Sequence, residues 1–347
     1  MKVLPFLFII SGLAPLLLSS CKKEDHSEHT VLNINYPAAY VVNGGSGTVS
    51  VINLTDQKVQ DQISLNGATY PHHIYFNQDK SLAAVAITAT DLSGGHAGHG
   101  NSVAGLKVQI INTVTGEIVK EISLTKLPHN AVFNPSGSEL WIGQMDTMQS
   151  QVLVYNTADW SLKKTISVGK GLSEVTFSGN GLKVFAANTM DNTVSIISPS
   201  TYDVEKTLVV GADPVGAWPG TDGNMYVDNE LSKDVSVISV STGLVMDTIP
   251  LGYKPGFVAQ HSNGEVWVSD ATNGGIGVYE PMGDHWMTTA MITTGADAHG
   301  IAFNSDGSKA YVTNQGAATV SVIDVATHKK LQDIGVGSKP NGLILKQ

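Results

Sequence analysis

A short hydrophobic strand motif recurs seven times along the chain, and this repetition constrains the fold more than any other feature. Two clear copies are Tyr40-Val41-Val42-Asn43 and Tyr311-Val312-Thr313-Asn314. The anchor positions of the copies are residues 40, 84, 141, 185, 226, 267 and 311, which gives spacings of 44, 57, 44, 41, 41 and 44 residues. A period of this length is typical of repeat architectures in which each unit stacks on its neighbours.

Each repeat contains four short segments with the patterning of β-strands. After the anchor comes a second alternating run, such as residues 193–197, and then a third, such as residues 163–168 of another repeat. A proline or small residue then leads into a further strand, such as residues 300–303, and the turn sequence Asn304-Ser305-Asp306-Gly307 follows it. Four short strands at this period form a propeller blade, so the sequence predicts an all-β, seven-bladed β-propeller.

The two ends of the repeat array have complementary phases. The array begins at the second strand of a blade and finishes with Gly342-Leu343-Ile344-Leu345, which has the pattern of a first strand. We therefore expect the C-terminal strand to complete the N-terminal blade, because this closure leaves no open edge between the first and last units.

The repeat motif also carries a family resemblance. Tyr311-Val312-Thr313-Asn314 matches the signature of YVTN-type propellers verbatim, and Tyr40-Val41-Val42-Asn43 is a degenerate copy. The sequence resembles this family, which includes YncE-like and surface-layer-like proteins, over residues 38–347. The resemblance implies a propeller fold in an exported protein and assigns no chemistry to it.

The N-terminus has the pattern of an export signal. Lys2 precedes an apolar run from Val3 to Leu18, which is too short for a confident membrane span. The run ends in Leu18-Ser19-Ser20-Cys21, which resembles a bacterial lipobox; this resemblance implies that Cys21 is lipidated. Because Lys22 rather than an aspartate follows, it also implies sorting to the outer membrane, on its periplasmic or surface face.

These segments give a three-part organisation of the chain. We predict a lipoprotein signal peptide at residues 1–20, a disordered tether at residues 21–37 and the propeller at residues 38–347. Cys21 is the only cysteine, so no internal disulfide can form. The formal charge of −10 argues against a nucleic-acid partner. We expect a monomer that contacts the membrane through its lipid alone and binds an unidentified envelope protein or glycan.

Candidate site residues lie where each blade's first strand enters the central channel. The entry residues of four neighbouring blades are His299, Asn341, His72 and His129, and Ser173 follows in the next blade. The next positions inward add His73 and Glu174. Imidazole is a frequent ligand of zinc and copper, so the cluster predicts a site for one transition metal ion, and no other cofactor is indicated. In the alternative interpretation, these histidines only hydrogen-bond to backbone or water.

One connection is longer than its counterparts. The repeat that starts at Ala84 has a glycine-rich insertion between its second and third strands, and this insertion contains His96 and His99. We expect the connection to lie on the face where the first strands enter the channel. Both histidines are therefore candidate metal ligands as well, since long loops on a rigid scaffold are often functional.

Two classes of function remain open from the sequence. The first is a non-catalytic binding module that holds a protein, glycan or metal ligand at the channel rim. The second is a mononuclear metalloenzyme or copper-handling protein, because Pro71-His72-His73 loosely resembles the histidine pairs of the nitrous-oxide reductase propeller. The chain lacks a Gly-x-Ser-x-Gly elbow and a P-loop, so these motifs support no serine hydrolase or nucleotide-dependent enzyme. Whether the protein is an enzyme therefore stays open.

Overall fold

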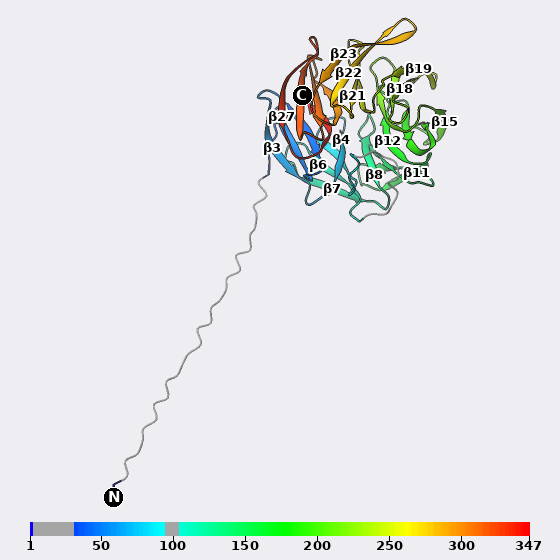
Figure 1. Ribbon diagram of the computed structural model, residues 1–347. Coiled ribbons are helices and arrows are strands. Elements are labelled where there is room, and N and C mark those ends of the chain that lie inside the picture. Colours follow the sequence, from blue (N-terminus) through cyan, green and yellow to red (C-terminus); the bar gives the residue numbers. More distant parts are fainter. Residues whose placement is uncertain (3–30, 94–103) are drawn as a thin grey trace. The chain divides into compact units, whose positions relative to one another are not determined.

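The computed structural model describes residues 1–2, 31–93 and 104–347, and it contains two units, Met1–Thr30 and Val31–Gln347. The second unit is a β-propeller of seven four-stranded antiparallel sheets (Figure 1). This confirms the predicted all-β class and the number of blades. In the part of the chain that is described, no helix is long and apolar enough to cross a membrane.

Each blade contributes one strand to each of four concentric positions. The innermost strands are β28 (Pro340–Lys346), β4 (Pro71–Phe76), β8 (Pro128–Phe133), β12 (Leu172–Phe177), β16 (Pro214–Pro219), β20 (Pro255–Gln260) and β24 (Ala298–Phe303). The second strands are β1 (Ala38–Asn43), β5 (Leu82–Ile87), β9 (Glu139–Gln144), β13 (Val184–Asn188), β17 (Asn224–Asn229), β21 (Val266–Asp270) and β25 (Lys309–Asn314).

The outer half of each blade is more exposed to solvent. The third strands are β2 (Thr48–Asn53), β6 (Lys107–Asn112), β10 (Gln151–Asn156), β14 (Thr193–Ile197), β18 (Asp234–Ser239), β22 (Gly275–Met282) and β26 (Thr319–Asp324). The outermost strands are β3 (Lys58–Ser64), β7 (Ile118–Ser123), β11 (Leu162–Ser167), β15 (Val204–Val209), β19 (Leu244–Pro250), β23 (His285–Thr293) and β27 (Lys329–Gly335). A short 3₁₀ helix, η1 (Thr189–Asp191), follows β13.

The C-terminal strand closes the ring as the sequence predicts. β28 pairs antiparallel with β1, with Tyr40 opposite Ile344 and Val41 opposite Leu343. The blade β28-β1-β2-β3 therefore joins strands from both ends of the described propeller. Closure satisfies backbone groups that an open array would expose at its ends.

The repeat asparagine has a structural role at the end of the second strand. In the first blade, the Nδ2 group of Asn43 donates hydrogen bonds to Thr48 Oγ1 at 3.1 Å and to Ser50 Oγ at 2.9 Å, both on the next strand. A Cβ atom on Gly337 would lie 2.6 Å from Asn43 Cγ, so only glycine fits beside the asparagine. The same asparagine–glycine pairing recurs at Asn188 with Gly169, Asn229 with Gly211 and Asn314 with Gly295.

Residues 31–37, which the sequence predicts to be part of the tether, pack against the propeller. The backbone N–H groups of Leu32 and Ile34 donate to Thr115 and Val114 at 3.1 and 2.9 Å. Ile34 is 1 % exposed and belongs to the core cluster around β1 and β5. The apolar residues Leu32 and Ile34 therefore begin the folded body before β1.

Candidate metal centre

The channel-lining residues stand on a β-bulge that recurs in the innermost strands. In β4, Pro71 pairs with Ile87 and Ile74 pairs with Val85, so three steps along this strand match two along β5. The bulge therefore lies at His72 and His73, and the side chains of both residues are buried. The same irregularity occurs at the matching positions of β8, β12, β20 and β24.

The bulges of three blades bring imidazoles together across the channel. The ring centroids of His72 and His73 lie 4.3 Å apart, and those of His72 and His129 lie 4.4 Å apart. One ligand atom from each of these three side chains lies within 4.8 Å of the other two. The ring of His299 lies farther out, with its centroid 6.2 Å from that of His72 and 6.0 Å from that of His73.

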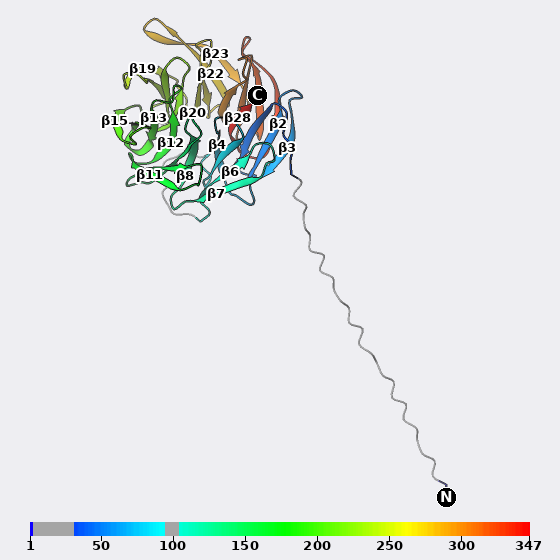
Figure 2. The same cartoon turned by 180° about the vertical axis from the view of Figure 1, so that it is seen from behind.

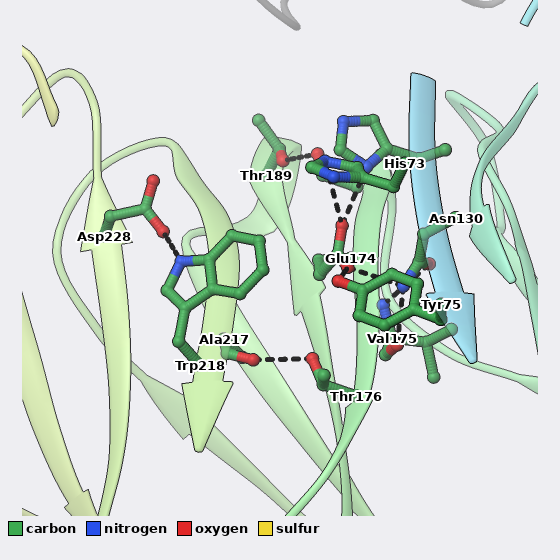
Figure 3. A network of polar contacts seen from close by, with 12 residues as sticks. His73, Tyr75, Asn130, Glu174, Val175, Thr176, Thr189, Ala217, Trp218 and Asp228 are labelled. Atoms are coloured by element: carbon green, nitrogen blue, oxygen red, sulfur yellow. Dashed lines mark hydrogen bonds and ion pairs between the residues drawn. The ribbon is translucent and has the colours of Figure 1, made fainter. Parts of the chain in front are cut away.

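Glu174 lies against this histidine cluster and is fully buried (Figure 3). Its Oε2 atom is 3.0 Å from His129 Nδ1 and 3.6 Å from His73 Nε2. Its Oε1 atom accepts hydrogen bonds from the Tyr75 hydroxyl at 2.6 Å and from Asn130 Nδ2 at 2.5 Å. Burial raises the pKa of Glu174 well above its usual range, and the charge of Asp228 acts in the same direction, against hydrogen bonds from Tyr75 and Asn130.

A tryptophan from the next blade closes one side of the cluster. The Trp218 indole donates from Nε1 to Asp228 Oδ1 at 2.7 Å, and its ring centroid is 6.0 Å from that of His73 (Figure 3). Its other neighbour is Phe257, at a centroid distance of 3.8 Å. A Cβ atom on Gly216 would lie 2.3 Å from the Trp218 ring, so glycine at this position makes room for the indole.

The other predicted site residues differ in where they lie: Ser173 is directed toward Thr189 of η1, whereas Asn341 stays close to His72. Ser173 Oγ hydrogen-bonds to Thr189 Oγ1, and Thr189 Oγ1 also donates to the Pro214 carbonyl at 2.7 Å. Asn341 is buried beside His72, and its Oδ1 atom has no hydrogen-bond partner among the described residues. His96 and His99 lie outside the described residues.

Two adjoining hollows lead to the histidine cluster, and both include His72 in their walls. Both are open to solvent, and the larger one also reaches His299. Leu92 and Ser93, from the long connection after β5, line both hollows. The described part of this connection therefore borders the channel mouth.

The channel mouth carries lysine and carboxylate side chains of both charges, which the sequence analysis does not predict. Lys339 forms an ion pair with Asp91, and Lys254 Nζ lies 2.8 Å from Glu230 Oε2. Asp297 adds a further carboxyl group. Burial raises its pKa to about 6, although the positive charges of Lys254 and Lys339 act to lower it. Several of these residues directly precede a first strand, which is the signal that identifies them in the sequence.

Among the residues sequence reasoning missed are also Tyr75, Asn130 and Trp218. Asn130 follows His129 at the position that corresponds to His73 and Glu174 in their own blades, so the repeat alignment contains its signal. Tyr75 and Trp218 occupy a position nearer the far end of their strands. No sequence pattern marks them, because their contacts with Glu174 and His73 join different blades.

Comparisons with known proteins support the fold of the molecule. No family model matches the sequence, and no curated protein matches it. Among solved structures, a periplasmic gluconolactonase of Pseudomonas aeruginosa is 17 % identical with a TM-score of 0.72, over 90 % of this chain and 99 % of that one. A proposed 6-phosphogluconolactonase of Bacteroides fragilis is 13 % identical with a TM-score of 0.72, over 90 % and 99 % of the two chains.

A third similar structure is hydrazine synthase of Kuenenia stuttgartiensis, which is 16 % identical with a TM-score of 0.64, over 78 % of this chain and 88 % of that one. These likenesses show the fold. The chain is a seven-bladed β-propeller whose architecture is shared with lactonase-like proteins.

Proposed function

We propose that this protein is an exported, YVTN-type envelope lipoprotein whose propeller binds one transition metal ion, zinc or copper, in its channel. The observation that carries the proposal is the convergence of His72, His73 and His129, with ligand atoms within 4.8 Å of one another in a buried site. Lipidation at Cys21 and residence in the outer membrane are part of the proposal and rest on the sequence of the N-terminus.

The three imidazole nitrogens suit a metal ion of intermediate hardness, such as zinc or copper. Zinc–imidazole bonds of about 2.0–2.1 Å place neighbouring ligand nitrogens of a tetrahedral site roughly 3.3 Å apart. Small side-chain rotations would bring the three imidazoles from within 4.8 Å to that separation. Imidazole nitrogen suits zinc and copper, whereas an oxygen-rich site would suit calcium or magnesium.

Glu174 fits the role of a residue that orients one ligand. A metal-binding histidine usually donates its other ring N–H to a carboxylate, which sets its tautomer. Glu174 Oε2 lies 3.0 Å from His129 Nδ1, so Nε2 of that ring would be its ligand atom for the metal. Buried carboxylates are costly when uncompensated, and Glu174 and Asp228 are both fully buried, so a nearby cation would stabilise their charged forms.

The experiment is a metal analysis of the purified body, residues 31–347, after loading with zinc or copper and desalting. We expect close to one bound ion per chain and loss of that ion in a His72→Ala/His129→Ala variant. A His285→Ala/His328→Ala variant removes two histidines outside the cluster and is the matched control. At a ligand concentration 100 times Kd, binding stabilises the folded state by about 2.7 kcal/mol. Metal-free protein whose thermal stability is unchanged by either ion would contradict the proposal.

A second candidate function is metal-assisted hydrolysis of a sugar lactone. The observation that favours it is the larger hollow, where His299 and Asp297 face the same space as His72. A bound zinc ion would supply a Lewis acid that polarises a carbonyl group. Two of the similar structures belong to proteins described as lactonases. Ring opening of gluconolactone above the spontaneous rate, lost in the same double variant, would favour this function over binding alone.

A further inference from the structure

Lysines protect most of the propeller's outer edge. An outermost strand presents unpaired backbone groups, and a lysine on it discourages pairing with another chain. Five of the seven outermost strands contain lysine: Lys58 in β3, Lys120 in β7, Lys163 and Lys164 in β11, Lys206 in β15, and Lys329 and Lys330 in β27. The two exceptions, β19 and β23, belong to neighbouring blades.

One or two exposed large apolar side chains occur on each of the other outermost strands, such as Leu162 in β11 and Leu331 in β27, whereas the outer strands of these two blades carry three each. We call this group the methionine surface: Leu244, Val245, Met246, Met282, Met287 and Met291, which are between 38 and 62 % exposed. The hairpin formed by β22 and β23 is the longest in the propeller and projects beyond the neighbouring blades (Figures 1 and 2). Its Trp286 Nε1 donates to Asp247 Oδ2 of β19 at 2.8 Å, which joins the two parts of the surface.

The charge pattern of β23 is compatible with a second copy of the chain as the partner. No Asp, Glu, Lys or Arg occurs between Trp286 and Thr293, so antiparallel pairing of this strand with a second copy of itself would place no like charges opposite each other. The same pairing would oppose lysines in β11 and β27. β23 is also the end of its sheet, whose strand order is β20-β21-β22-β23.

From this surface we infer that two copies of the chain form a two-fold dimer by antiparallel pairing of their β23 strands. Such an interface is isologous, because each strand contributes the same residues to it. Pairing satisfies edge backbone groups and places Met287 and Met291, which lie on β23 itself, in the interface. Methionine suits such contacts because its flexible thioether adapts to the opposing surface. The dimer is independent of metal binding and replaces the expectation of a monomer.

The first test is sedimentation velocity of the body, residues 31–347, over a range of concentrations. We expect a reversible dimer whose dissociation constant rises at least tenfold in a Thr288→Lys/Met291→Lys variant. Both residues are exposed in the monomer, so the substitutions add charge to the edge without disturbing the core. Thr165→Lys on β11 is the control and should leave association unchanged. A wild-type body that stays monomeric at all concentrations would overturn the proposal, and so would a dimer that is insensitive to the β23 variant.

The second test locates the two-fold axis. The body contains no cysteine, so a single introduced cysteine reports on its own surroundings. In a scan of Trp286, Met287, Thr288, Thr289, Ala290 and Met291, the positions nearest the axis should form an intermolecular disulfide, because opposing Cα atoms in an antiparallel pair lie about 4.5–5.5 Å apart. Thr165→Cys should not cross-link. Dimerisation without cross-linking at any β23 position would refute pairing through this strand.

Discussion

Replacement of Asp297 by asparagine should stabilise the protein near neutral pH. Burial raises the pKa of this carboxyl from 3.8 to about 6, although Lys254 and Lys339 favour its ionised form. Because the folded pKa is higher than the unfolded one, the folded state holds the proton more tightly. Stability is therefore lost as the pH rises from about 4 to about 6.

The size of this effect follows from the separation of the two pKa values. Each pH unit of separation corresponds to about 1.36 kcal/mol, which sets an upper bound of roughly 3 kcal/mol for Asp297. The side chain is partly exposed and lies close to Asp91 and Glu230 as well as the lysines, so solvent screening reduces the effect to about 1–2 kcal/mol. The Asp297→Asn variant removes this term, since an amide does not ionise.

The assay is urea unfolding of the wild type and Asp297→Asn at pH values from 4 to 8, with a chelator present so that no metal contributes. The difference between the two free energies of unfolding should be small near pH 4 and grow to about 1–2 kcal/mol in favour of the variant by pH 7.5. A difference that does not change with pH, or a variant less stable than the wild type at pH 7.5, would refute the reasoning.

Two further substitutions test the packing that positions the site. Gly216→Ala places a Cβ atom 2.3 Å from the Trp218 ring and should cost about 1–3 kcal/mol with a shift in tryptophan fluorescence; Gly335→Ala, where no atom lies within 4 Å, is the control. Asn188→Ala removes hydrogen bonds to Thr193 and Ser195 at 3.1 and 3.0 Å and should cost about 1–3 kcal/mol in chemical unfolding; no measurable loss would contradict the role given to the repeat asparagine.

The sequence by itself determined the propeller. Seven copies of one hydrophobic pattern, each with four strands, leave few ways to bury every copy, and the phase of the two ends requires β28 to pair with β1. It also placed His72 and His129 at the entry of their innermost strands. The local sequence of each repeat is sufficient for these features, because the contacts that form a blade join residues close together in the chain. The hydrogen bonds from Asn43 to Thr48 and Ser50 are an example.

Only the tertiary structure decided which of those entry residues meet. The bulges turn His73 and Glu174 into the channel beside His72 and His129, whereas Ser173 contacts Thr189. Tyr75 of β4 donates to Glu174 of β12, and Trp218 of β16 lies beside His73 of β4, so both contacts cross blade boundaries. Distances between residues of different blades depend on the tilt and radius of the whole ring, and all seven sheets set these together, so no single repeat encodes them.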